Sequence, residues 1–284
     1  MPATGNKSFR PLSLSIRLRA DGFSFFVCDI QTAALIRGEH FRGDADTAQA
    51  IAEVLQRKEY SGSQIDQVYV LAQPPFCHVP LEHFRREEAT AFYKLAVNSD
   101  TTVPPRVGYN ILPSLEVAIL YAIPADVEEV ILQYFPTARF FASQAMLIER
   151  LAVNAESLRD DDSDALPLFV CIDDFQLSVH HFIPDATATE TPRLHFTNTF
   201  NVATTDDALY FILAVWKALG LNATKDTVIL LGQPSPLLQE LHDALADYVI
   251  NLRQIAADSL FPNISLARER EVPLDLMSLL LNRI

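Results

Sequence analysis

Short apolar stretches with a period of two open the chain. Residues 12–18 alternate leucine or isoleucine with serine or arginine, which is the pattern of a half-buried β-strand. Asp21-Gly22 follows and predicts a two-residue hairpin turn, because both central positions of a type I′ turn need a positive φ. Residues 23–29 and 33–41 are also strand-like, so an antiparallel group of three strands is predicted.

Helices and strands alternate through the rest of the first half. Pro124 precedes a helix with acidic residues in its first turn, as the helix dipole favours. Asp44 and Ser143 are the expected caps of two other helices. The predicted order is a helix over 44–55, a strand over 66–71, a helix over 81–97, strands over 107–112 and 115–121, a helix over 126–134, a strand over 138–142 and a helix over 143–154.

The second half begins again in the same order. Strands are predicted over 168–172, 175–182 and 193–200, a helix over 206–219, a strand over 226–231 and a helix from about 235 to 247. Gly220 is the expected C-terminal cap of the first of these helices. The tail 274–284 is rich in leucine but only about three turns long, so it would be marginal alone. We expect it to dock on its own protein rather than on another chain.

The two halves also match residue by residue. Residues 66–74 align with residues 226–234 without a gap, and Asp, Val, Leu, Gln and Pro recur at an offset of 160. The hairpins at 21–23 and 173–175 align at an offset of 152, and a longer connection near 184–192 would explain the difference. We interpret the chain as an internal duplication. It predicts a first subdomain over 1–155 with an extra strand–helix insertion, an acidic linker over 156–165, and a second subdomain with the tail over 166–284.

Composition narrows the function classes. The chain has 284 residues, is 49% hydrophobic and carries a formal net charge of −14, which argues against a nucleic-acid partner because such partners need a basic face. No apolar run approaches the length of a membrane span, and the polar start does not resemble a secretory signal. The three cysteines, Cys28, Cys77 and Cys171, are scattered singly, which favours a reducing compartment. Cys28 and Cys171 lie in apolar strand-like runs and are expected to be buried. The expected location is the cytoplasm.

Two segments resemble a known family. Residues 13–25, which read SLSIRLRADGFSF, and residues 272–276, which read VPLDL, are similar to the uncharacterised Bacteroidetes family DUF3822. The strand-to-helix junction at 120–124 is similar to that of the PilM and GspL type of secretion platform protein. This resemblance implies an α/β protein with a duplicated actin-like ATPase (ribonuclease H-like) fold. It would have two mixed five-stranded sheets flanked by helices, with an interdomain cleft.

The resemblance also indicates where a nucleotide would bind. In ATP-using members of the superfamily, the turn between the first two strands of each half holds phosphate, which here corresponds to Asp21, Gly22, Asp173 and Asp174. Gly232 stands where the adenosine side has a glycine pair. Phe23 is bulky, and the second turn has two carboxylates and no glycine, so both turns depart from the ATP-binding pattern. We therefore expect no cofactor.

No catalytic or metal-binding constellation is evident. His180 and His181 should point to opposite faces of a strand, and a proline separates His78 from His83, so no metal site is predicted. The aromatic residues Phe76, Phe84, Phe92 and Tyr93 are interpreted first as core and second as a contact surface.

Three hypotheses follow from these observations. The first is a non-enzymatic scaffold or adaptor with an unidentified protein partner. The second is an ATPase or phosphotransferase that holds Mg-ATP in the cleft with Asp21 and Asp173. The third is a homo-oligomeric structural protein.

Overall fold

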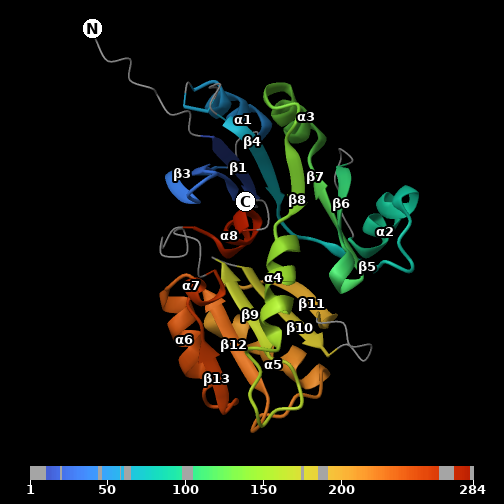
Figure 1. Ribbon diagram of the computed structural model, residues 1–284, viewed down its shortest axis with the longest axis vertical. Coiled ribbons are helices and arrows are strands. Elements are labelled where there is room, and N and C mark those ends of the chain that lie inside the picture. The colour runs from blue at the N-terminus through green and yellow to red at the C-terminus, as the bar shows by residue number, and fades with distance from the viewer. Residues whose placement is uncertain are drawn as a thin grey trace.

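The computed structural model describes residues 11–19, 21–43, 47–57, 59–60, 65–97, 105–173, 176–184, 191–261 and 272–281. Figure 1 shows two large β-sheets, one in each half of the chain, with a smaller third sheet beside the first. This arrangement is an α/β fold with two mixed five-stranded sheets, as the family resemblance implies. Within the described residues, no helix is long and apolar enough to cross a membrane.

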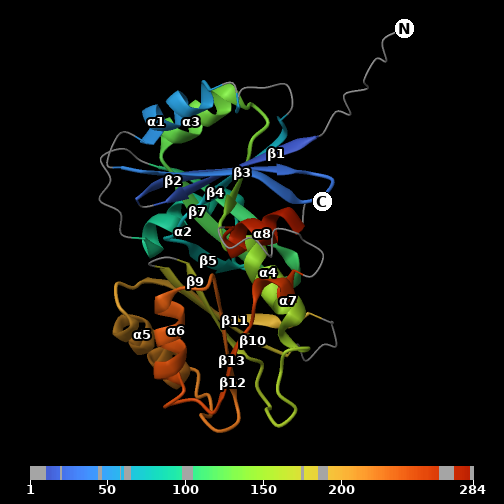
Figure 2. The same cartoon turned by 90° about the vertical axis from the view of Figure 1, so that its left-hand side faces the viewer.

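The first sheet contains the antiparallel start of the chain and two parallel strands. Its order is β3 (Ala34–Arg42), β2 (Gly22–Asp29), β1 (Leu12–Arg19), β4 (Ile65–Ala72) and β8 (Arg139–Ala142). The helices α1 (Thr47–Leu55) and α3 (Ala125–Tyr134) contact each other and cover one face of this sheet, as Figure 2 shows. β1 is buried along almost its whole length because it lies in the middle of the sheet.

The second sheet repeats this order. It runs β11 (Arg193–Asn201), β10 (Gln176–Ile183), β9 (Leu168–Asp173), β12 (Thr227–Gly232) and β13 (Asn251–Gln254). The helices α5 (Thr205–Ala218) and α6 (Pro236–Leu245) pack on one face around a core of their own. Gly220 has a φ of +69°, and Leu221 N–H donates to Trp216 O at 3.2 Å, so the predicted glycine cap of α5 is confirmed.

The insertion in the first half forms the third sheet. Its order is β5 (Cys77–Pro80), β7 (Val117–Ile123) and β6 (Arg106–Leu112), with α2 (Ala89–Ala96) and the 3₁₀ turns η1 (Arg86–Glu88) and η2 (Pro113–Leu115). Tyr93 is buried, Phe76 packs against the first core, and Phe84 and Phe92 pack against the core of the third sheet. The aromatic residues therefore serve the cores of the protein.

Two helices fill the space between the large sheets. α4 (Ala145–Ala155) leaves the first sheet and packs against α8 (Leu274–Leu281), while the short α7 (Ala257–Leu260) also contacts α4. Figure 2 shows α8 beneath the first sheet, on the face opposite α1 and α3. Leu276, Met277 and Leu279 of α8 are fully buried in the first core. The expectation that the tail docks on its own protein is confirmed.

The strand registers show how the halves correspond. Arg17 of β1 pairs with Leu71, and Cys171 of β9 pairs with Leu231. The sequence alignment matches Leu71 with Leu231 at an offset of 160. Their strand partners Arg17 and Cys171 therefore also correspond, at an offset of 154. The ladder irregularities lie between Val27 and Cys28 in one half and between His181 and Phe182 in the other, again 154 residues apart. The sheets therefore repeat in detail, down to the same bulge.

This register corrects the hairpin alignment made from the sequence. Arg19 pairs with Gly22, so the first turn lies between these two residues and Gly22 already belongs to β2. Asp173 pairs with Gln176, so the second turn lies between that pair. The hairpins thus align at an offset of 154 rather than 152, because strand pairing, and not the shared Asp-x-Phe pattern, sets their correspondence. The equivalent of Asp173 in the first half is Arg19.

Other local predictions also differ from the structure. The helix predicted over 81–97 is replaced by a turn, η1 and the shorter α2, and the short strands β5 and β13 are not among the predicted elements. Gln144 is the N-cap of α4 and its side chain makes no capping hydrogen bond, while Ser143 uses its backbone N–H to donate to Ala72 O at 2.8 Å. Asp44, the expected cap of α1, lies outside the described residues.

Candidate functional site

A buried arginine joins the two halves and the last helix. β1 carries Arg17 on the face that looks toward α8, β9 ends at Asp173, and Asp275 lies in the first turn of α8. Arg17 Nε donates to Asp275 Oδ2 at 2.8 Å, and Arg17 Nη2 donates to Asp173 Oδ2. The Arg17 and Asp275 side chains are only 5% and 7% exposed, whereas Asp173 is 39% exposed. Three segments distant in sequence therefore meet at one guanidinium.

The electrostatics of this cluster follow from its burial. Burial lowers the pKa of Arg17, but the charges of Asp275 and Asp173 outweigh it, so the net shift is upward and the guanidinium stays charged. Burial raises the pKa of Asp275, Asp173 adds to this shift, and Arg17 opposes it. Removal of the guanidinium would therefore leave a buried carboxylate with no opposite charge.

Two glutamines from the repeated Gln-Pro motif support the cluster. In the side-chain orientation that gives both the amide nitrogen and the amide oxygen of Gln73 a hydrogen-bond partner, the nitrogen donates to Gln176 Oε1 at 2.8 Å and the oxygen accepts from Arg17 at 3.3 Å. Gln233, its counterpart in the second half, donates from Nε2 to Val272 O at 2.6 Å, just before α8. The matched motif thus has a structural role in both halves, since each copy holds part of the junction with α8.

A small polar cavity remains beside Arg17. Its volume is about 40 Å³. Gln144 Nε2 donates to Thr199 Oγ1 at 2.5 Å, and Gln144 Oε1 is buried without a hydrogen-bond partner. Water occupies such sites when polar partners are present. The lining includes Arg17, Gln144, Asp173, Gln176, Ser178 and Asp275.

This space does not fit Mg-ATP. Pockets that enclose nucleotide-sized ligands usually have volumes of about 300–1,000 Å³, several times that of the cavity beside Arg17. The Asp173 carboxylate, the expected metal ligand of the second turn, is already paired with Arg17. No group of three His, Cys, Asp or Glu side chains that could hold a metal ion occurs in the part of the chain that the structure describes.

The first turn is engaged in contacts of its own. Asp21 accepts from Arg19 Nε at 2.9 Å and forms an ion pair with Arg42 Nε at 3.4 Å, and the hydrogen bond from Arg19 lowers the pKa of Asp21. Gly22 has a φ of +141°, and a Cβ at this position would collide with the carbonyl oxygen of Phe41 on the neighbouring strand. The glycine is required by strand packing, whether or not an anion binds.

Gly232 also has a packing role. A Cβ at Gly232 would lie 2.8 Å from the carbonyl oxygen of Ile172 on the adjacent strand β9. Because Ile172 precedes Asp173, Gly232 lies close to the Arg17 cluster, whereas Asp21 and Gly22 form their contacts at the margin beside β3. Asp174, the remaining predicted site residue, lies outside the described residues. The structure thus joins Asp173 to residues other than Asp21.

Sequence reasoning missed Arg17, Asp275 and Gln144 as the centre of this junction. Two signals were present. Arg17 is a charged residue within the predicted strand 12–18, and Asp275 is the only charge in an apolar run from Val272 to Leu281. A lone charge in an apolar segment suggests a buried partner, because an unpaired buried charge is costly.

Histidines form a second buried polar group. His180 contacts Thr197 Oγ1 at 2.8 Å and Ser178 Oγ at 3.2 Å, and His181 Nδ1 lies 3.1 Å from His195 Nδ1. Thr197 and Ser178 lie on the His180 face of the sheet, so His180 and His181 point in opposite directions as predicted. Burial lowers the pKa of His180 to about 3, and burial together with His195 lowers that of His181 to about 4.

Acidification should therefore destabilise the protein. Both histidines stay neutral in the folded state, while the unfolded chain takes up protons as the pH falls below about 6.5. Between pH 7.5 and pH 5.5 the two groups together should lower the free energy of unfolding by roughly 3 kcal/mol. Urea denaturation at the two pH values measures this change. A His180→Gln variant should show only about half of this pH-dependent decrease. An unchanged pH dependence in that variant would contradict the assignment of the decrease to the buried histidines.

Comparisons with known proteins identify the fold and the family. The model of the family described as protein of unknown function (DUF3822) matches residues 7–252. The chain belongs to the DUF3822 family. No curated protein matches it. A structure from Bacteroides thetaiotaomicron, described as a protein with actin-like ATPase fold and unknown function, is 21% identical, with a TM-score of 0.76 over 96% of each chain.

A second solved structure is the PilM–PilN type IV pilus biogenesis complex. It is 12% identical and has a TM-score of 0.53, with 96% of this chain and 98% of that chain covered. Both similarities concern the fold, because the identities are below 25%. The DUF3822 chain therefore has the actin-like ATPase fold, in agreement with the resemblance seen in its sequence.

Proposed function

We propose that this chain is a non-catalytic binding or scaffold protein that keeps the actin-like fold without using a nucleotide. The observation that carries the proposal is the position of Arg17. Its guanidinium lies buried between Asp173 and Asp275, where the second hairpin faces the first sheet, and leaves a cavity of only about 40 Å³. A triphosphate and its metal would have to displace this ion-paired cluster, at a cost that includes leaving buried charges unpaired.

The roles of the glycines support the same proposal. Gly22 and Gly232 both have close backbone neighbours that leave no room for a Cβ, so strand packing accounts for each of them. The solved PilM–PilN structure is a complex between proteins, which supports a protein partner for this chain as well. We further propose that the protein acts in the cytoplasm, with its three cysteines as buried free thiols and without nucleic acid or membrane insertion.

Calorimetry with nucleotides tests the proposal. Titration of the full chain with ATP, ADP or GTP at millimolar concentration in the presence of Mg²⁺ should give no saturable heat. The melting temperature should stay within about 1 °C, because a ligand at one hundred times its Kd would add about 2.7 kcal/mol of stability and several degrees. A nucleotide-binding protein measured in parallel confirms that the nucleotide stocks are active.

One result would favour the nucleotide-dependent phosphotransferase instead. This would be a rise of several degrees with Mg-ATP that Asp21→Ala or Asp173→Asn abolishes. Light scattering tests the third hypothesis, because a molar mass equal to that of the monomer would exclude a homo-oligomeric structural protein.

A further inference from the structure

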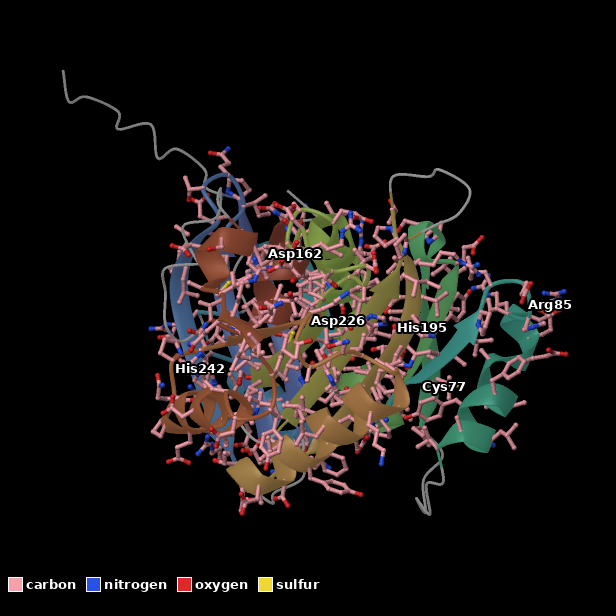
Figure 3. The ribbon with its side chains drawn as sticks, turned by 90° about the horizontal axis from the view of Figure 1, so that it is seen from below. Cys77, Arg85, Asp162, His195, Asp226 and His242 are labelled. Atoms are coloured by element: carbon pink, nitrogen blue, oxygen red, sulfur yellow. The ribbon has the colours of Figure 1, made fainter. Side chains whose placement is uncertain are left out.

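The bulge of the second sheet brings two histidines together. The ladder between β10 and β11 passes from the pair His181–Phe196 to the pair Phe182–Leu194, so His195 is left without a partner in this ladder. Neighbouring residues of a regular strand point to opposite faces, but the extra residue of a bulge re-aims its side chain. His195 Nδ1 lies 3.1 Å from His181 Nδ1. Figure 3 shows His195 on the second sheet, seen from below.

The first half of the chain shows that this bulge does not need histidine. Its ladder irregularity lies at the corresponding place, between Val27 and Cys28, and leaves out Ile36. Val27 is therefore the counterpart of His181, and Ile36 is the counterpart of His195. Their exposure agrees, since Val27 and His181 are 5% and 4% exposed, while Ile36 and His195 are both exposed. Because apolar residues suffice in one copy, packing of the bulge does not account for the two imidazoles of the other.

The His181 ring stays neutral at neutral pH, and neutral imidazole is the form that binds metal ions. Burial lowers the pKa of His181 to about 4 and His195 adds to this shift, while the backbone of Leu166 and the Asp226 carboxylate oppose it. When both rings are neutral, two Nδ1 atoms 3.1 Å apart share one N–H between them. A metal ion that takes the place of this proton moves it to Nε2 of the same ring, so no proton has to leave the pair.

The distance between the two nitrogens suits two ligands of one ion. Zn²⁺ binds imidazole nitrogen at about 2.0–2.1 Å, so two such ligands at a tetrahedral angle lie about 3.3–3.4 Å apart. The Nδ1 atoms of His181 and His195 are 3.1 Å apart, so a shift of a few tenths of an ångström is enough. His195 is exposed and can make this shift, and water has access to the remaining coordination positions.

The surroundings of the pair favour a cation. The Asp226 carboxylate lies close enough to favour positive charge at His181. It accepts from Ser163 Oγ at 2.8 Å and from Asn222 N–H at 2.6 Å, so it acts through its charge and not as a ligand. Exposed acidic side chains flank Ser163 in the linker, namely Asp161, Asp162 and Asp164. The net charge of −14 also attracts cations to the chain as a whole.

We propose that His181 and His195 bind a divalent transition-metal ion such as Zn²⁺ through their Nδ1 atoms. Such ions prefer imidazole nitrogen, whereas Mg²⁺ and Ca²⁺ prefer oxygen. Water completes the coordination, because the described residues hold no group of three His, Cys, Asp or Glu side chains that could bind a metal ion. The ion joins β10 to β11 on the face opposite Ser178, which lines the cavity beside Arg17. The inference therefore goes beyond the proposed binding function.

Calorimetry with Zn²⁺ tests the proposal on the full chain. The protein is treated with EDTA, the chelator is removed, and titration with Zn²⁺ should then give saturable binding of one ion per chain at micromolar concentration. His195→Gln should raise the Kd at least about tenfold, because loss of even a supporting partner of a metal ligand costs about that factor. His195 is exposed, so this change should leave the fold intact.

Another histidine provides the matched control. His242 of α6 has a side chain that is 33% exposed, and it lies at the opposite side of Figure 3 from His195. His242→Gln makes the same chemical change far from the pair, so it should change the Kd for Zn²⁺ less than about twofold. An equal loss of affinity in His195→Gln and His242→Gln would contradict the proposed site.

A double variant copies the first half of the chain into the second. His181→Val with His195→Ile places at this bulge the residues that its counterpart already holds at Val27 and Ile36, so the variant should fold and bind no Zn²⁺. Circular dichroism checks that it folds.

Nitrogen NMR of the histidine side chains identifies the ligand atoms. In the wild type, Zn²⁺ should shift the Nδ1 signals of two histidines, and both signals should be missing from the double variant. Absence of saturable heat, equal affinity of His195→Gln and the wild type, or shifts at Nε2 alone would each overturn the proposal. The nucleotide titrations contain Mg²⁺ and no Zn²⁺, so either proposal can fail alone.

Discussion

Replacement of Arg17 by methionine should lower the free energy of unfolding by about 3–5 kcal/mol. The side chain is 5% exposed, and its guanidinium is paired with Asp275, which is 7% exposed. Methionine would fill much of the volume but would leave the Asp275 carboxylate buried without a partner. Because burial already raises the pKa of Asp275, the Asp275 carboxylate of the variant should bind a proton. The loss of stability caused by Arg17→Met should therefore be smaller at lower pH than at neutral pH.

A double variant isolates the charge effect. Arg17→Met combined with Asp275→Leu removes both charges, and buried pairs replaced by apolar residues are often neutral or stabilising, so most of the loss should be recovered. Urea denaturation of the two single variants and the double variant gives the coupling energy. The exposed Arg85→Met serves as the matched control and should stay within about 0.5 kcal/mol of the wild type. Additive effects of Arg17→Met and Asp275→Leu would contradict the pairing.

Replacement of Leu276 in α8 by alanine should lower the free energy of unfolding by about 2–5 kcal/mol. Leu276 is fully buried in the first core, so Leu276→Ala would remove apolar contacts and leave a cavity in the region that joins α8 to α4. Since α8 spans only Leu274–Leu281, we expect the lost packing to loosen the whole helix rather than a single position.

A second leucine provides the control for this change. Leu95 of α2 is 87% exposed, so Leu95→Ala makes the same chemical change where little packing is lost, and should stay within about 0.5 kcal/mol. Urea denaturation compares the two variants, and increased binding of a hydrophobic dye would report a loosened α8. Equal stability of Leu276→Ala and Leu95→Ala would show that the helix does not hold the core.

Much of the fold could be predicted because its elements have strong local signals. The paired runs at 66–74 and 226–234 are central strands β4 and β12, whose near-continuous apolar character follows from burial on both faces. Gly220 could be placed because a helix end in the left-handed region favours glycine. The family resemblance then supplied the order of the strands, which hydrophobic patterns alone do not determine.

The remaining details depend on contacts between distant segments. The typical turn sequence Asp21-Gly22 predicts the first hairpin turn one residue later than the structure has it, because the register is set by the pairing of Gly22 with Arg19. β5 and β13 have four residues each, too few for a periodic pattern to stand out. The partner of Arg17 could not be derived from local pattern, because Asp275 is 258 residues away.

The return of the last helix to the first sheet has a consequence for synthesis of the protein. Residues 12–142 supply the first sheet, but α8, at residues 274–281, completes the core of that sheet. As the chain leaves the ribosome, the N-terminal half must therefore wait until residues 274–281 have been synthesised before its apolar face is covered. We expect this half to be the segment that chaperones hold during translation, and closure of this long loop to be the slow step of folding.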